Sequence, residues 1–128
     1  MRHTAKAIST ATAVAALLGT LAFSLPSISV AKDASAIAQG KKLAFNKKKG
    51  NCLACHEIKG GKLPGNIGPS LSIPGVAMKD RYPDKSKLRA QIYDARGRNP
   101  NTIMPPFGAH EIISEAELDN IVEFIYSL

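Results

Sequence analysis

The chain has 128 residues, enough for one domain, and its 17 lysines and arginines outnumber ten aspartates and glutamates to give a net charge of +7. A basic surface favours acidic partners, but the basic residues are not interleaved with aromatic ones, so no nucleic-acid partner is expected. The chain has only two cysteines, which excludes a cysteine-rich zinc cluster within one chain.

Residues 1–31 have the pattern of a cleaved secretory signal. Basic residues within 2–6 precede an apolar run over 13–23, and small residues lead up to position 31. Cleavage there, or less favourably after Ala36, would export residues 32–128 as one domain. The competing interpretation is a retained membrane anchor, but threonines and serines make the run less apolar than a good spanning helix, so no stable membrane insertion is expected after cleavage.

The first helix of the exported domain is expected to begin at a cap, Asp33 or Ser35, and to run to about Asn46. Gly40 in a helix interior costs about 1 kcal/mol relative to alanine. A close crossing by the C-terminal helix, with Phe124 against Gly40, would account for the glycine. The residues expected on the same face are Ile37, Ala44 and Phe45.

The segment Cys52-Leu53-Ala54-Cys55-His56 is a C-x-x-C-H motif, typical of covalent haem c attachment. Two thiols at this spacing reach the two vinyl groups on one edge of a haem, and His56 can then take an axial position on the iron. The competing interpretations are a thioredoxin-like dithiol, half a zinc site and a disulfide. A redox dithiol would be expected in a βαβ context, which the sequence does not show.

Two loop segments flank this motif. Residues 47–49 are three lysines, which form either a solvated turn or a positive rim that guides a partner. Residues 60–75 are rich in glycine and proline and predict an irregular loop. Pro69 within that loop is, on the residues alone, an ordinary turn proline.

A middle helix is expected from a cap at Asp84 or Ser86 to about Ala95. Gly97 and Pro100 then end it. The residues expected to face the core are Leu88, Ile92 and Tyr93.

Met104 lies in a loop over residues 99–108, because Pro105-Pro106 forbids a regular helix or a central strand. A thioether is a soft neutral ligand suited to haem iron, so Met104 is the candidate for the second axial position. The alternatives are a gap-filling core methionine at this position, or ligation by Met78 or His110 instead.

The last helix begins with a capping box over residues 114–117. Its apolar stripe comprises Leu118, Ile121, Val122 and Ile125, flanked by Phe124. No paired carboxylates on one face, Ser/His/Asp set or phosphate loop is found, so no catalytic residue is expected in this chain alone.

This order of elements resembles a class I monohaem cytochrome c over the whole of residues 32–128. The resemblance implies an all-α fold of three to four helices around one covalently bound haem c, with long loops rich in glycine and proline. It also implies that Cys52 and Cys55 tether the haem, that His56 and Met104 are the proximal and distal iron ligands, and that the Pro69 carbonyl accepts the His56 Nδ1–H.

A narrower resemblance is to SoxX, the family of small haem subunits of bacterial SoxAX complexes. The segments that carry it are residues 50–56, 64–69, 99–108 and 121–125. It implies a periplasmic electron-transfer subunit, partnered by a SoxA-like haem subunit that carries the reactive cysteine. That complex, an L-cysteine S-thiosulfotransferase, oxidatively couples thiosulfate to a cysteine of a SoxYZ-like carrier protein, and a downstream cytochrome accepts the electrons. The alternative is a free monohaem cytochrome c that diffuses between donors and a terminal oxidase.

Overall fold

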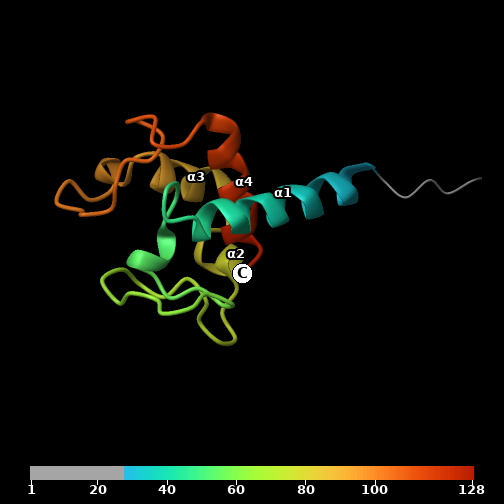
Figure 1. The fold of residues 1–128 in the computed structure, drawn as a ribbon, viewed down its shortest axis with the longest axis horizontal. Coiled ribbons are helices and arrows are strands. Elements are labelled where there is room, and N and C mark those ends of the chain that lie inside the picture. Colours follow the sequence, from blue (N-terminus) through green and yellow to red (C-terminus); the bar gives the residue numbers. More distant parts are fainter. Residues whose placement is uncertain (1–27) are drawn as a thin grey trace, which may run out of the picture.

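The computed structural model describes residues 28–128 (Figure 1). Its α-helices are α1 (Ile28–Phe45), α2 (Met78–Arg81), α3 (Lys85–Tyr93) and α4 (Glu115–Tyr126), and its 3-10 turns are η1 (Cys52–Ala54) and η2 (Ala95–Gly97). No strand occurs between residues 28 and 128, so the expected all-α fold is confirmed. The expected signal lies outside the described residues except for 28–31.

Helix α1 begins earlier than the sequence predicts. It starts at Ile28, so Asp33 and Ser35 are interior residues and not caps. Residues 28–38 contain neither glycine nor proline, and nothing in the local sequence stops the helix at Asp33. The helix therefore runs through the expected cleavage position at residue 31. No helix within the described part of the chain is both long and apolar enough to cross a membrane.

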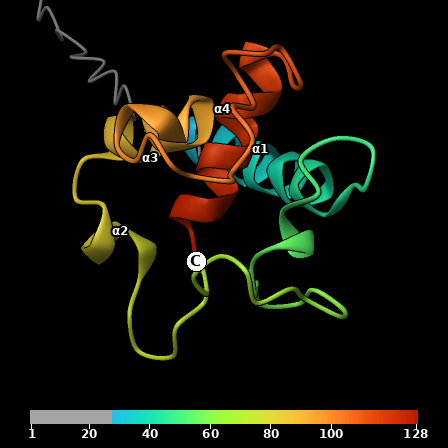
Figure 2. The same cartoon turned by 90° about the vertical axis from the view of Figure 1, so that its left-hand side faces the viewer.

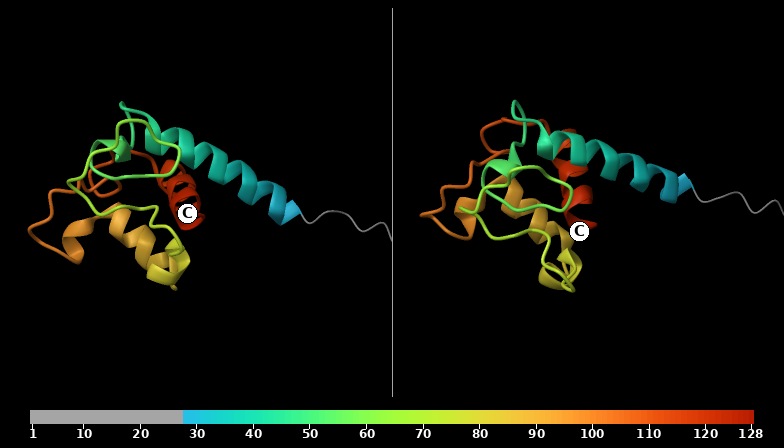
Figure 3. Two further views of the ribbon diagram at one scale, coloured as in Figure 1. Left: turned by 90° about the horizontal axis from the view of Figure 1, so that it is seen from below. Right: turned by 60° about the horizontal axis from the view of Figure 1, so that its bottom comes forward.

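Helices α1 and α4 cross at Gly40. A Cβ placed on Gly40 would lie 2.9 Å from the Cβ of Phe124 and closer still to the backbone oxygen of Asn120. Phe45 packs edge-to-face against Phe124, with ring centroids 5.8 Å apart. Figures 1 and 3 show α1 passing across α4 and continuing beyond it. The predicted crossing of the terminal helices at Gly40 is confirmed.

Helix α3 begins at a cap, as predicted, because the Asp84 side chain accepts a hydrogen bond from the Ser86 N–H at 2.9 Å. It ends at Tyr93, two residues before the predicted end, because Asp94 is extended (φ −155°) and instead caps η2. Tyr93 is not in the core: it is 36% exposed, and a Cβ on Gly108 would touch its ring.

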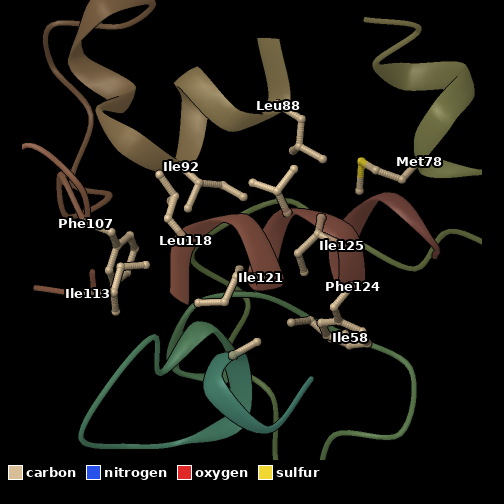
Figure 4. Packing of buried hydrophobic residues seen from close by; sticks show 12 residues of the cluster. Ile58, Met78, Leu88, Ile92, Phe107, Ile113, Leu118, Ile121, Phe124 and Ile125 are labelled. Carbon is tan, nitrogen blue, oxygen red and sulfur yellow. The ribbon is translucent and has the colours of Figure 1, made fainter. Parts of the chain in front are cut away.

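Helix α4 organises the core. The predicted capping box is present, with Ser114 N–H donating to Glu117 Oε2 at 2.9 Å and Glu117 N–H donating to Ser114 Oγ at 3.3 Å. The five predicted apolar residues of α4 are all buried. Leu88 and Ile92 of α3 are also buried and point toward α4 (Figure 4).

Helix α2 is a single turn that the sequence did not predict. Its first residue, Met78, is 1% exposed and packs in the core (Figure 4). The Met78 N–H donates to the Leu128 oxygen at 2.8 Å, which ties α2 to the end of α4. Figure 2 shows η1 and α2 on opposite sides of that end.

Candidate functional site

A cavity of about 680 Å³ lies between η1, α3, α4 and the loops around them. Its wall includes both cysteines and the histidine of the C-x-x-C-H motif, and Met104 from the loop before α4. The three motif residues precede Met104 by 48 or more positions in the sequence, yet all four side chains line the same cavity. Much of the remaining wall is apolar, including Leu88 and Ile92 of α3 and Ile121 and Ile125 of α4.

The motif is wound tightly by its own backbone. Asn51 enters η1 in the left-handed region (φ 47°), a conformation that asparagine tolerates better than most residues. The His56 and Cys55 N–H groups then both donate to the Cys52 oxygen, at 2.9 and 3.2 Å. This turn brings both thiols and the imidazole to the same wall of the cavity.

The two cysteines are free thiols and do not form a disulfide. Burial raises the pKa of the Cys52 thiol to about 11, and the nearby Cys55 contributes in the same direction. A thiol with such a pKa is almost fully protonated at neutral pH, and the thiolate is the nucleophile in disulfide exchange. The raised pKa makes Cys52 a poor nucleophile, and residues 28–128 contain no strand, so the βαβ context expected of a redox dithiol is absent from this part of the chain.

His56 is held by the loop that contains Pro69. His56 Nδ1–H donates to the Pro69 oxygen at 2.7 Å, the bond that the family resemblance implies. A Cβ on Gly68 would lie within 2.6 Å of the same nitrogen, so only glycine lets the loop approach the ring this closely. With its proton on Nδ1, the imidazole keeps the Nε2 lone pair for a metal.

Met104 is positioned by two linked turns. Its N–H donates to Thr102 Oγ1 at 3.1 Å, and the Thr102 N–H donates to the Asn99 oxygen at 3.1 Å. Two prolines follow with fixed φ, and the buried Phe107 anchors the end of the loop in the core. The half-buried Met104 side chain lies in the cavity wall.

The two alternative axial ligands differ in position. Met78 also lines the cavity, but its side chain is 1% exposed and belongs to the packed core. His110 is exposed and is not part of the cavity wall. The geometry therefore brings Met104 and Met78, but not His110, to the space beside His56.

The three lysines at 47–49 lie at the cavity wall and are exposed to solvent. Lys49 pairs with Glu117 at 2.8 Å, which ties this turn to the start of α4. Two isoleucines that also line the cavity, Ile67 and Ile103, are 64% and 75% exposed. The cavity therefore has a rim that is both basic and apolar. This position is consistent with the interpretation of residues 47–49 as a positive rim.

Sequence reasoning missed Gln91 and Arg81, which also line the cavity. Gln91 Nε2–H donates to Met104 Sδ at 3.9 Å, and Arg81 Nη1–H donates to the Ser70 oxygen at 2.9 Å. Gln91 lies three residues after the predicted core residue Leu88 and so shares its helix face. That spacing was the available signal, although it does not reveal the contact with Met104.

The residues present fit a haem. Two thiols, one imidazole of fixed tautomer and one thioether open on the same apolar space, and these are the groups that attach and ligate such a cofactor. Among residues 28–128, no group of three or more His, Cys, Asp or Glu side chains offers a competing metal site.

This fold and site define a small helical carrier of one metal-bearing, largely apolar group. Residues 37–128 match the cytochrome c family, and the chain belongs to that family. It is therefore an electron-transfer c-type cytochrome with haem c, covalently attached, as its cofactor. No curated protein matches the chain in sequence.

Proposed function

We propose that this cavity holds one haem c, tethered by Cys52 and Cys55, with His56 as proximal and Met104 as distal iron ligand. The observation that carries the assignment is that all four side chains open on one cavity while His56 Nδ1 is bonded to the Pro69 oxygen at 2.7 Å. Met104 is favoured over Met78 because it lies in a braced loop at the wall, whereas Met78 is packed in the core.

The proposed ligand set determines the kind of chemistry. A haem in this site supplies an iron that gains and loses one electron. His56 and Met104 would hold the iron from the protein side, which would leave no ligand position for a substrate or for oxygen. The hydrogen bond to His56 and the turns before Met104 would help to keep both ligands in place. These properties suit electron transfer.

For the particular role, we propose a periplasmic SoxX-type subunit, exported by the signal over residues 1–31. All four segments that resemble SoxX, 50–56, 64–69, 99–108 and 121–125, contribute residues to the cavity wall. The chain has no third cysteine, so the sulfur-bearing thiolate would come from a SoxA-like subunit. This chain would take the electrons released when thiosulfate is joined to a SoxYZ-like carrier and pass them to a downstream cytochrome.

The alternative proposal is a free cytochrome that serves several donors and a terminal oxidase. The exposed lysines at 47 and 48 favour it, because a charged rim promotes fast and brief encounters with acidic partners. The two proposals differ in the partner contact: a permanent subunit needs an interface of roughly 2,000 Å² or more, whereas redox encounters bury about 1,200 Å² or less.

Co-purification from a host growing on thiosulfate distinguishes the two. The full chain carries a C-terminal tag and is washed in high salt, which screens charge contacts but leaves a large apolar interface intact. The SoxX-type role predicts an equal amount of a second haem-bearing chain with a reactive cysteine. A red protein that elutes alone and is reduced by many donors would contradict it and support the free carrier.

A pair of charge variants sharpens this test. Lys47→Glu with Lys48→Glu reverses charge at the cavity rim, while Lys59→Glu with Lys62→Glu makes the same change in net charge at two exposed residues outside the cavity wall. The free-carrier role predicts that only the rim variant slows reduction by donor proteins at low salt. A permanent subunit should still co-purify its partner in both variants.

A further inference from the structure

Leu63 is the most exposed of the large apolar residues that the structure describes, at 96%. A single exposed apolar side chain is ordinary on a protein surface, but the backbone of Leu63 is unfavourable as well. Its φ is 53°, in the left-handed region that leucine rarely adopts. The following Pro64 disfavours this further, because a residue before proline prefers extended backbone. Neither the side chain nor the backbone of Leu63 therefore stabilises this chain on its own.

The loop that carries Leu63 is held on the haem motif from both sides. After Leu63, the Gly65 N–H donates to the Leu53 oxygen at 2.7 Å, and a side chain at Gly65 would collide with the Ala54 carbonyl. Before Leu63, a side chain at Gly61 would collide with the side chain of Leu53. These close approaches fix where Leu63 is presented, and a backbone that is already fixed loses little conformational freedom when a partner binds.

The charged groups around Leu63 are mainly basic. Lys59 and Lys62 are exposed in the same loop, and the ammonium of Lys41 on α1 lies beside it. Glu57 is the one acidic residue between positions 57 and 68. Two copies of this chain that met through the loop would bring like charges together, which disfavours a homodimer. The surface instead fits a partner protein that is acidic around an apolar pocket.

The surface around Leu63 is separate from the basic rim of the cavity. Leu63 does not line the cavity, whereas Lys47 and Lys48 do. Figures 1 and 2 show the turn over residues 47–49 and the loop over residues 60–66 on opposite sides of η1. An electron-transfer subunit needs one contact with its donor and another with its acceptor. A partner that covers Leu63 would leave the basic rim free for the second contact.

We propose that Leu63 is the anchor of a permanent interface, and that it enters an apolar pocket edged by carboxylates on the haem-bearing partner subunit. The inference rests on the proposed function, because a free carrier has no permanent partner. Burial of the leucine slows dissociation, whereas the lysines around it mainly set the rate of encounter. High salt screens the charge contacts, so retention of the partner there depends on Leu63.

The test uses the tagged full-length holoprotein, purified together with the second haem-bearing chain from a host growing on thiosulfate. Leu63→Ser removes the apolar side chain, and Leu63→Gly also removes the strain of the left-handed backbone. Ile73→Ser is the matched control, because isoleucine is an isomer of leucine and Ile73 is an exposed residue outside the cavity wall. The rate at which the second chain dissociates in high salt is measured for each variant, and urea denaturation is measured for each chain alone.

We expect both Leu63 variants to lose the second chain about tenfold to a hundredfold faster than wild type, as burial of a whole leucine side chain predicts. Ile73→Ser should match wild type. Leu63→Gly should denature at a higher urea concentration than wild type, so that weaker binding accompanies a more stable fold. A lower urea midpoint for Leu63→Gly would show that Leu63 serves folding and would overturn the proposal.

The remaining outcomes separate this inference from the proposed function. Unchanged retention in Leu63→Ser, or an equal loss in Ile73→Ser, would overturn the anchor and leave the permanent subunit intact. A wild-type chain that elutes alone would reject the permanent subunit, and the anchor with it. The free wild-type chain is also tested for sedimentation with anionic phospholipid vesicles and for self-association. Either property, if Leu63→Ser abolishes it without changing retention of the second chain, would replace the partner by a membrane or a second copy.

Discussion

At the scale of single residues, the two proposed axial ligands are held in different ways. His56 is fixed by a short hydrogen bond to a backbone oxygen of an irregular loop and by the close approach of Gly68 to its ring. Met104 is fixed by the turns before it, the prolines after it and the weak bond from Gln91. The position of Met104 depends on more contacts than that of His56, so substitutions around Met104 are expected to be the more frequent cause of a change in potential.

Substituting Met104 tests the distal assignment. We expect Met104→Ala to keep the haem attached, because the tethers are elsewhere, and to lower the reduction potential by on the order of 0.1 V or more, because His/Met ligation raises it. Redox titration of the purified holoprotein measures this. Met78→Leu is the control and should leave the potential near that of wild type. If only Met78→Leu changes the potential, Met78 is the ligand.

The sequence predicted the site residues that carry local motifs and missed those that depend on tertiary contacts. The C-x-x-C-H spacing identified His56, and the prolines after Met104 marked a stiff loop; the structure brings both to one cavity. Gln91 and Arg81 reach that cavity only because α2 and α3 pack beside it. The sequence contains no motif that relates these two residues to the ligands, so their position in the cavity wall could not be predicted from it.

At the scale of elements, the crossing of α1 and α4 depends on the absence of a side chain at Gly40. The helix ends were predicted less well than this crossing. The start of α1 at Ile28 was missed because no strong signal in the sequence stops the helix at Asp33. The end of α3 at Tyr93 was missed because Asp94 caps the following turn. The crossing was predictable because an interior glycine is unfavourable in a helix unless something packs on it.

Replacing Gly40 tests the crossing. Alanine would improve helix propensity by about 1 kcal/mol, but its Cβ would overlap the Asn120 carbonyl. We expect overpacking to dominate and Gly40→Ala to lower the free energy of unfolding by about 1–3 kcal/mol. Gly97→Ala is the matched control, since a Cβ there meets no atom within 4 Å. Urea denaturation of both variants measures the difference, and equal stabilities would count against the crossing.

The ion pair between Lys49 and Glu117 ties the turn before the haem motif to α4. The hydrogen bond from Lys49, and then the Ser114 N–H, lower the pKa of Glu117 from its ordinary value of 4.5. A carboxyl with a lowered pKa stabilises the fold above its unfolded-state pKa, and this contribution is lost as the pH falls through the folded-state pKa.

Glu117→Gln isolates the charge, because glutamine can still accept the Ser114 N–H in the capping box. We expect the variant to be less stable than wild type by about 0.5 kcal/mol at neutral pH, as for an ion pair that is partly exposed to solvent. The difference should disappear in acid as Glu117 becomes protonated. Urea denaturation at both pH values measures it, and a difference that is equal at neutral and acid pH would show that the charge is not responsible.

At the scale of the whole molecule, the helices make a frame and the loops complete the site. Helices α1 and α4 cross through Gly40 and Phe124, which do not line the cavity, whereas Ile121 and Ile125 on another face of α4 do. Helices α2 and α3 and the loops form the rest of the wall. An apolar cavity of about 680 Å³ in so small a domain predicts that the cofactor stabilises the fold, because a bound haem would fill space that the side chains leave open.

The most direct test of this account is the haem that stays with the polypeptide after denaturation. Wild type and the double variant Cys52→Ala with Cys55→Ala are expressed in a host that attaches haem c, then denatured and extracted with acidified acetone. The account predicts one haem retained per wild-type chain and none in the variant, because the two thioethers are the only covalent links. Haem that remains bound to the variant, or a wild-type chain that loses its colour, would contradict it.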